Sequence, residues 1–277
     1  MMIQDETGKL AIWDIFRETY AVFFTHLKSH VILSYLYSLP IGFFVLGGGL
    51  DLSSISPGHG MAELDLPPVF WGFIVVAFLW AAVIHLLYFR LYLLGRDRYL
   101  SFSLPDLGRM VVKFVLYSVL FILLLFIFML SANMVIGLVT LIFSALTGGS
   151  PLTTTITVLS GLAASVFLFI IALRMLPTFA SIAENARFLP FRESWYYTRG
   201  EGLKLVFIYL TILAPAWFVV FLTSAAVTAV MPGDLSDVSP SSGSGLLILQ
   251  LLLSPVGVAP GALIGAATTR VYCLLVR

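Results

Sequence analysis

The residues with the most potential for chemistry are basic and aromatic, and they gather in residues 187–204 (RFLPFRESWYYTRGEGLK), between two long apolar runs. Pro190 suits the first turn of a helix. Phe188, Phe191 and Trp195 are spaced by three and four residues, which places them on one helical face and leaves the arginines for the other. A short helix of this kind is typical of a membrane interface. A solvated loop between two spans is the alternative.

Other basic residues end the apolar runs, at the height expected for lipid headgroups. A basic side chain there adds about 1 kcal/mol of attraction to an anionic membrane. These residues could act only as topology anchors, or they could form a surface that binds headgroups. The candidates for that surface are Arg90, Arg174, Arg187, Arg192, Trp195, Arg199 and Lys204.

Histidines offer little support for a metal centre. His26 and His30 are four residues apart and could share a metal on one helix face, but no third ligand completes an HExxH-like set. His59, Glu63 and Asp65 could chelate a divalent ion only weakly. We therefore predict no metal site and no cofactor.

Catalytic sets are missing as well. The sequence shows no Ser-His-Asp arrangement, no glycine-rich phosphate loop and no paired carboxylates within an apolar run. His85 lies in an apolar run, where an ionisable residue is a functional candidate. No acidic or basic residue falls in the middle of a run, so a proton relay or ion path lacks its usual parts. We predict that the protein is not an enzyme.

The composition is that of a membrane protein. Of the 277 residues, 60% are hydrophobic and 10% are charged, whereas soluble domains carry about 25% charged residues. The net charge of +1 and the lack of a long basic tract give no basis for binding nucleic acid. We predict an all-α polytopic protein that forms a single integral membrane domain over residues 1–277.

Six apolar runs predict six transmembrane helices. Pro40 lies in the first and should free a carbonyl near Leu36, and Pro215 lies in the fifth. The third run would reach about 54 Å as one helix, so we expect one span with a helical extension. The predicted spans cover residues 31–50, 70–89, 111–146, 152–172, 205–231 and 246–268.

An amphipathic helix should precede the first span, in residues 10–28. Its apolar residues are spaced by three and four positions and make one stripe, which predicts a second interfacial helix. The stripe consists of Trp13, Phe16, Tyr20, Phe23 and Leu27.

Charge distribution predicts the orientation. With six spans, all 15 Lys and Arg residues fall on one side of the membrane, together with both termini. By the positive-inside rule this side is the cytoplasm.

One plan recurs three times along the chain: an interfacial helix, a span, an outer loop and a span ending in arginine. The units cover residues 10–96, 104–187 and 188–277, and their closing arginines are Arg90, Arg174 and Arg270. Each unit starts and ends on the same side, so the repeats are parallel. Three such hairpins could pack around a pseudo-threefold axis.

Small residues mark one face of the sixth span. Gly257, Gly261 and Gly265 are four residues apart, and such spacing allows helix backbones to approach closely. This predicts helix packing within the chain or self-association.

Residues 170–215 resemble the repeated signature of the membrane domain of glycerophosphoryl diester phosphodiesterases, and are similar to uncharacterised bacterial six-span inner-membrane proteins. The resemblance implies a multi-pass protein of the bacterial cytoplasmic membrane. The catalytic barrel of those enzymes and its metal-binding carboxylates are absent, so phosphodiesterase activity is not implied. The matching positions are Arg174, Pro177, Glu184, Ser194, Trp195, Thr198, Arg199 and Gly200.

We therefore expect a non-catalytic protein that binds membrane lipids, anionic ones in particular, a partner membrane protein or a second copy of itself. The alternative is a transporter or permease for an uncharged or lipid-like solute, with a cavity near the kinks at Pro40 and Pro215.

Overall fold

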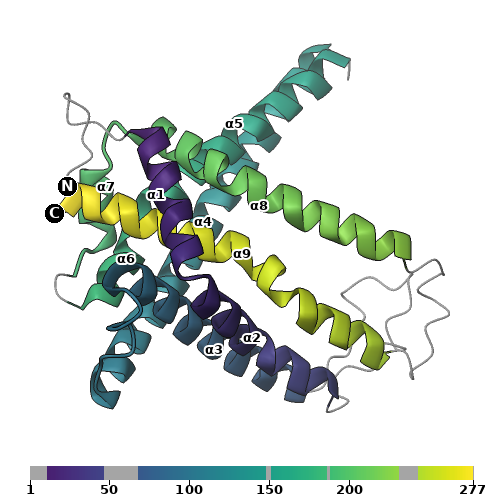
Figure 1. The fold of residues 1–277 in the computed structure, drawn as a ribbon. Helices are drawn as coiled ribbons and strands as arrows, with labels where there is room; N and C mark the ends of the chain where they lie inside the picture. The colour runs from purple at the N-terminus through teal and green to yellow at the C-terminus, as the bar shows by residue number, and fades with distance from the viewer. Residues whose placement is uncertain (1–10, 47–67, 148–150, 186–187, 231–242, 277) are drawn as a thin grey trace.

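A computed structural model describes residues 11–46, 68–147, 151–185, 188–230 and 243–276. Within these ranges the regular structure is entirely helical, as predicted (Figure 1). The helices are α1 (Ile12–Thr25), α2 (Leu27–Leu46), α3 (Pro68–Leu94), α4 (Leu104–Thr147), α5 (Pro151–Met175), α6 (Pro177–Glu184), α7 (Phe191–Tyr197), α8 (Gly202–Val230) and α9 (Gly243–Val276).

Five segments are long and apolar enough to cross a membrane, which indicates a multi-pass membrane protein. They are Phe70–Leu94, Leu104–Leu146, Pro151–Glu184, Gly202–Ala226 and Leu253–Leu275. The first predicted span, residues 31–50, corresponds to α2, but its last four residues lie outside the described part of the chain.

Helix α9 lies at the centre of the main bundle, where it contacts α1, α2, α3, α6 and α8. Small residues on its buried side, such as Ala262 and Ala266, let these neighbours approach. Tyr209 of α8 is fully buried against α9, and its hydroxyl lies 2.7 Å from the Thr268 hydroxyl. The core is therefore built around one helix of small residues.

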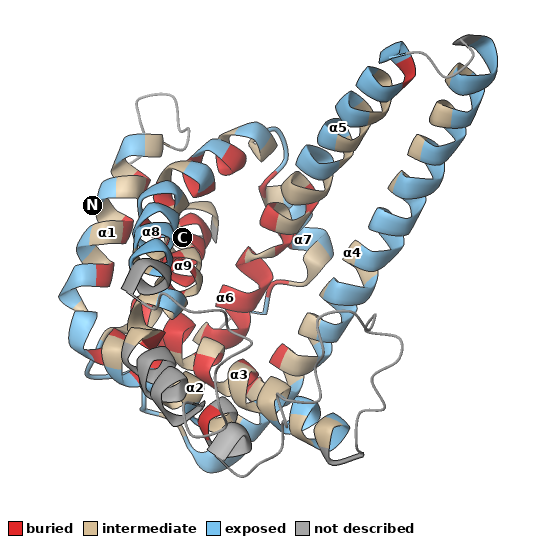
Figure 2. Cartoon of the chain, turned by 90° about the vertical axis from the view of Figure 1, so that its right-hand side faces the viewer, coloured by how far each residue is buried: buried red, intermediate tan, exposed pale blue. Residues whose placement is uncertain are grey.

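The α4–α5 hairpin leans away from this bundle, and much of its surface is exposed (Figure 2). Large apolar side chains on α4 are exposed, among them Leu116, Phe126 and Leu138. An apolar surface of this extent marks a site of contact with membrane or protein, and here it fits contact with hydrocarbon.

Aromatic side chains bond backbone carbonyls near two of the prolines that lie inside helices. The Trp80 indole N–H donates to the carbonyl of Leu36, at 2.6 Å, which is the carbonyl that Pro40 was predicted to free. Tyr20 donates its hydroxyl to the Ile212 carbonyl, 2.8 Å away, just before Pro215. The bond from Trp80 satisfies a freed group that hydrocarbon could not.

Helix α1 precedes the first span as predicted, but its stripe is displaced. The buried residues are Ile15, Thr19 and Phe23. Of the predicted apolar stripe, Phe16 and Tyr20 pack partly buried against the core, whereas Trp13 and Leu27 are 72% and 43% exposed, and Leu27 begins α2. The core contacts α1 along a line about one residue away from the line of aromatics.

The middle unit of the proposed repeat differs from the others. Helix α1 precedes α2 and α7 precedes α8, whereas α4 includes its own extension and begins at Leu104 as one helix of 44 residues. The short buried helix α6 was not predicted. The three-unit plan therefore stays a prediction.

Candidate functional site

The basic stretch forms a compact chain of turns between α5 and α8. Pro177 begins α6, and Asn185, the C-cap residue after Glu184, takes the left-handed conformation with φ 57°. Pro190 then takes the N-cap position of α7. Gly200, with φ +85°, turns the chain into α8, and a residue with a Cβ would be strained there. Local sequence thus brings α7 back onto the end of α5.

Arg174 of α5 links this helix to α7 through side-chain and backbone contacts. Its Nε donates to the Thr198 hydroxyl at 3.0 Å, and its Nη2 donates to the Trp195 carbonyl at 2.6 Å. The guanidinium carbon also lies 3.6 Å from the centre of the Trp195 ring, and the Ser194 hydroxyl donates to the Arg174 carbonyl at 2.6 Å. We call Arg174, Ser194, Trp195 and Thr198 the Arg174 clamp.

The clamp carries positive charge on its outer side. Arg192 and Arg199 are exposed, and Arg174 is partly exposed. Arg199 is close enough to repel the charge on Arg174. Within the described ranges, no carboxylate oxygen lies within 4.0 Å of any of the three guanidinium groups. We call Arg174, Arg192, Trp195 and Arg199 the basic surface; it can attract a phosphate, which guanidinium groups bind in a planar, bidentate manner.

Arg90 differs sharply from Arg174 although both end an apolar run. Helix α3 continues past it to Leu94, and Arg90 is only 4% exposed. Its guanidinium donates to three carbonyls, those of Tyr99 at 2.9 Å, Ala183 at 3.0 Å and Ser101 at 3.1 Å. Arg90 therefore holds α3, α6 and the connector before α4 together, and we leave it out of the basic surface.

The remaining headgroup candidates are placed as follows. Lys204 is half-exposed and lies 3.1 Å from the Glu201 carboxylate. Arg187 lies outside the described residues.

The predicted aromatic face of α7 is divided in two. Tyr117 of α4 contacts both Phe188 and Phe191, with ring centres 5.0 and 5.1 Å apart. Trp195 instead lies on Arg174. The prediction of one shared face is wrong because Phe188 precedes the helix and α4 covers Phe191.

The histidines have structural contacts. His30 is buried, with Nε2 3.0 Å from the Pro255 carbonyl and Nδ1 3.1 Å from the Tyr88 hydroxyl. His30 thus joins α2 to α3 and α9 and has both ring nitrogens engaged. The other suggested ligands, His59, Glu63 and Asp65, lie outside the described residues.

A cavity of about 360 Å³ lies between α3, α4, α6 and α9. Its wall is mostly apolar and aromatic, and its polar side chains are His85, Tyr88 and Ser118. This cavity was not predicted from the sequence. The sequence features that could have indicated the cavity are the polar residues in the apolar runs of α3 and α4, together with glycine on α9.

The glycines of α9 are in different surroundings. A Cβ at Gly265 would lie 3.7 Å from the Tyr92 ring, whereas a Cβ at Gly257 or Gly261 would meet nothing within 4 Å. Gly261 lines the cavity, and Gly257 is exposed. Self-association through this face stays a prediction.

Comparisons with known proteins give no further guide, since no family model, curated protein or solved structure matches the chain. The resemblance to the membrane domain of glycerophosphoryl diester phosphodiesterases therefore stays a prediction.

Proposed function

We propose that this protein is a non-catalytic integral membrane protein that binds anionic lipid headgroups at the basic surface. The observation that carries the proposal is the group of three arginines, Arg174, Arg192 and Arg199, which have no carboxylate partner among the described residues. A lipid phosphate would supply the missing negative charge.

The geometry of the Arg174 clamp supports this role. Thr198 and the Trp195 carbonyl hold Arg174 in place, so less side-chain entropy is lost when a phosphate binds. Trp195 is 38% exposed, and tryptophan is enriched at the level of the headgroups. At about 1 kcal/mol for each basic side chain, the three arginines together favour an anionic lipid by roughly 3 kcal/mol, or about a hundredfold.

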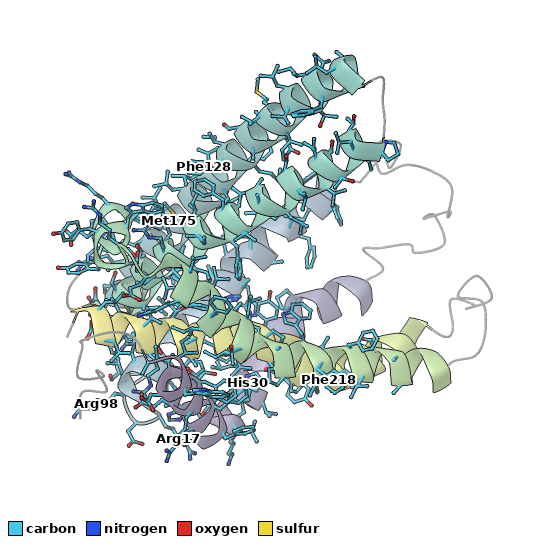
Figure 3. All side chains as sticks on the ribbon, turned by 90° about the horizontal axis from the view of Figure 1, so that it is seen from above. Arg17, His30, Arg98, Phe128, Met175 and Phe218 are labelled. Atoms are coloured by element: carbon cyan, nitrogen blue, oxygen red, sulfur yellow. The ribbon has the colours of Figure 1, made fainter. Side chains whose placement is uncertain are left out.

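The proposal includes the orientation of the chain. In our proposal α2 is the first of six spans, both termini face the cytoplasm, and the basic surface faces the inner leaflet of the bacterial cytoplasmic membrane. Arg98 and Arg17 lie toward the same end of the molecule as Met175, with Phe218 farther out along α8 (Figure 3). This arrangement supports a basic inner end and an apolar body. The roles we propose are in scaffolding, assembly or membrane homeostasis, with a partner membrane protein or a second copy on the exposed helices.

A second candidate function is transport of an uncharged or lipid-like solute, and the apolar cavity favours it. The cavity is not at the proline kinks, where the sequence analysis placed it. The freed carbonyl of Leu36 is bonded by Trp80, and the Ile212 carbonyl by Tyr20.

Thermal unfolding with added lipid tests the main proposal. A lipid that binds only the folded protein raises its Tm. In a neutral detergent, phosphatidylglycerol should raise the Tm of the wild type, and phosphatidylcholine should not. The gain should be lost in the Arg192→Ala/Arg199→Ala double variant and kept in the Arg98→Ala/Arg109→Ala double variant. An equal gain in both variants would disprove binding at the basic surface.

A further inference from the structure

The cavity between α3, α4, α6 and α9 has the size and lining of a small-molecule site. Its volume of about 360 Å³ lies within the range of about 300–1,000 Å³ found for ligand pockets. Phe114 and Phe121 of α4 and Phe179 of α6 form much of the wall. Ala82 and Gly261 leave the space open, because larger side chains at either position would enter it.

The mouth of the cavity faces the apolar surface of the molecule. Ile122 lines the cavity and is 54% exposed. Its neighbours on α4, Val119 and Leu123, are 51% and 53% exposed. Figure 2 shows α4 leaning outward from the bundle. In a membrane this surface contacts hydrocarbon, so the occupant enters from the bilayer and carries an acyl or alkyl chain.

One polar atom in the wall has a defined hydrogen-bonding role. His85 Nδ1 lies 2.8 Å from the carbonyl of Ala81. A carbonyl can only accept, so Nδ1 carries the proton, and Nε2 of the neutral ring keeps its lone pair. Nε2 has no hydrogen-bond partner among the described residues, and the ring is held in place by an edge contact with Tyr37. His85 therefore offers an acceptor.

Ser118 of α4, which also lines the cavity, adds a hydroxyl that can donate. Its hydroxyl makes no hydrogen bond within the part of the chain that the structure describes, although Ser118 lines the cavity. The third polar side chain, Tyr88, is already bonded to Ser34 and His30. A ligand hydroxyl has the complementary chemistry, since a hydroxyl can donate to His85 Nε2 and accept from Ser118.

The depth of His85 narrows the class of lipid. His85 precedes Arg90 by five residues of α3, or about 7.5 Å at 1.5 Å per residue. The polar group of the ligand therefore lies below the arginine level and inside an apolar wall. Burying an unpaired phosphate there would be costly, whereas an uncharged hydroxyl is satisfied by the two side chains.

We propose that this cavity binds an uncharged lipid with a free hydroxyl, of the diacylglycerol class, with one chain in the cavity and the hydroxyl between His85 and Ser118. The site is separate from the basic surface and does not depend on the function proposed for it. It also gives the transport alternative a defined class of solute.

Photolabelling tests the cavity. The probe is a diacylglycerol with a diazirine on one acyl chain, in phosphatidylcholine nanodiscs that contain the full-length protein. In the wild type, label should appear in peptides that cover residues 78–89 and 114–122. Gly261→Leu fills the cavity, and Gly137→Leu is the matched control because Gly137 is exposed on α4 and its Cβ would also meet nothing within 4 Å.

We expect labelling of these peptides to fall about tenfold, the effect of 1.4 kcal/mol, in Gly261→Leu and to be unchanged in Gly137→Leu. Ser118→Leu provides a second way to fill the space if Gly261→Leu does not fold. Equal labelling of a folded cavity-filling variant and the control would overturn the proposal. The Arg192→Ala/Arg199→Ala variant should label like the wild type, which separates this test from the test of the basic surface.

A second probe tests the hydroxyl. In the same diacylglycerol the free hydroxyl is capped as a methyl ether. The wild type should label better with the free hydroxyl, and His85→Phe, which keeps an aromatic ring but has no acceptor, should label equally with both probes. Equal labelling of the wild type by the two probes would refute recognition of a hydroxyl by His85.

Discussion

Replacing Arg90 by methionine should strongly destabilise the protein, although the guanidinium has no carboxylate partner among the described residues. Arg90→Met keeps the apolar stem and removes only the charged group. In the wild type that group donates to the carbonyls of Tyr99, Ala183 and Ser101, at 2.9, 3.0 and 3.1 Å. The variant leaves these three carbonyls without this donor; the bond to Ala183 is buried, and the two bonds to the connector are partly buried.

The size of the loss can be worked from these contacts. A hydrogen bond from a charged donor contributes about 1.5–3 kcal/mol, which gives a gross value of roughly 4–9 kcal/mol for three bonds. The cost of burying the guanidinium is recovered in the variant, and removal of one member of a buried charged network costs about 3–5 kcal/mol in practice. We expect a loss of about 4 kcal/mol.

The assay is the free energy of unfolding from a detergent titration, followed by helical circular dichroism. Arg98→Met is the control, because the structure gives the exposed Arg98 side chain no hydrogen bond or ion pair. A surface change of this kind should stay within about 0.5 kcal/mol of the wild type. If Arg90→Met also fell within 1 kcal/mol of the wild type, the structural role assigned to Arg90 would be refuted.

Three further predictions concern packing and pH. Trp80→Phe removes the indole N–H that bonds the carbonyl freed by proline in α2. This variant should lower the free energy of unfolding by about 1 kcal/mol in the same titration. An unchanged free energy of unfolding would show that the carbonyl finds another donor. Gly202→Ala places a Cβ 2.9 Å from a side chain of α5 and should lower the Tm, at a cost of about 1–3 kcal/mol, whereas Gly108→Ala, in open space, should be neutral or stabilising. Burial, and to a smaller extent the charge of Arg96, hold the pKa of His26 below its usual 6.5. The unfolded chain then binds the proton more readily, so the contribution of His26 to stability is complete above pH 6.5 and falls as the pH drops below it. Tm values measured at several pH values should show this fall. In the His26→Asn variant, the dependence of Tm on pH should be weaker.

Local rules predicted the helices of this fold well. Long apolar runs predicted α3, α4, α5, α8 and α9, because a backbone in hydrocarbon must bond within its own segment. The carbonyl of Leu36 could be predicted because proline frees a group four residues earlier. These features depend on residues close together in the chain.

The roles of the arginines could not be predicted in this way. Arg90 and Arg174 follow similar apolar runs, yet one is buried and the other is partly exposed. The difference arises because α6, from a distant part of the sequence, covers the end of α3 and presents its Ala183 carbonyl to Arg90. No pattern of residues close together in the sequence predicts this contact between α6 and Arg90.

The same limit applies to polar residues in the spans. Asn133 is an amide in the apolar run of α4, and its side chain donates to the Met129 carbonyl of its own helix. His85 also bonds its own helix, and only the approach of α4 and α9 makes His85 part of a cavity wall. Burial and partners depend on tertiary packing, which periodicity does not encode.

The most direct test of the central claim is the ratio of lipids that the basic surface retains. The protein would be released from nanodiscs of equal parts phosphatidylglycerol and phosphatidylcholine, and its retained lipids counted by native mass spectrometry. We predict that the wild type retains mainly phosphatidylglycerol, that Arg98→Ala/Arg109→Ala does the same, and that Arg192→Ala/Arg199→Ala retains the two lipids equally. An unchanged preference for phosphatidylglycerol in the Arg192→Ala/Arg199→Ala protein would contradict the account.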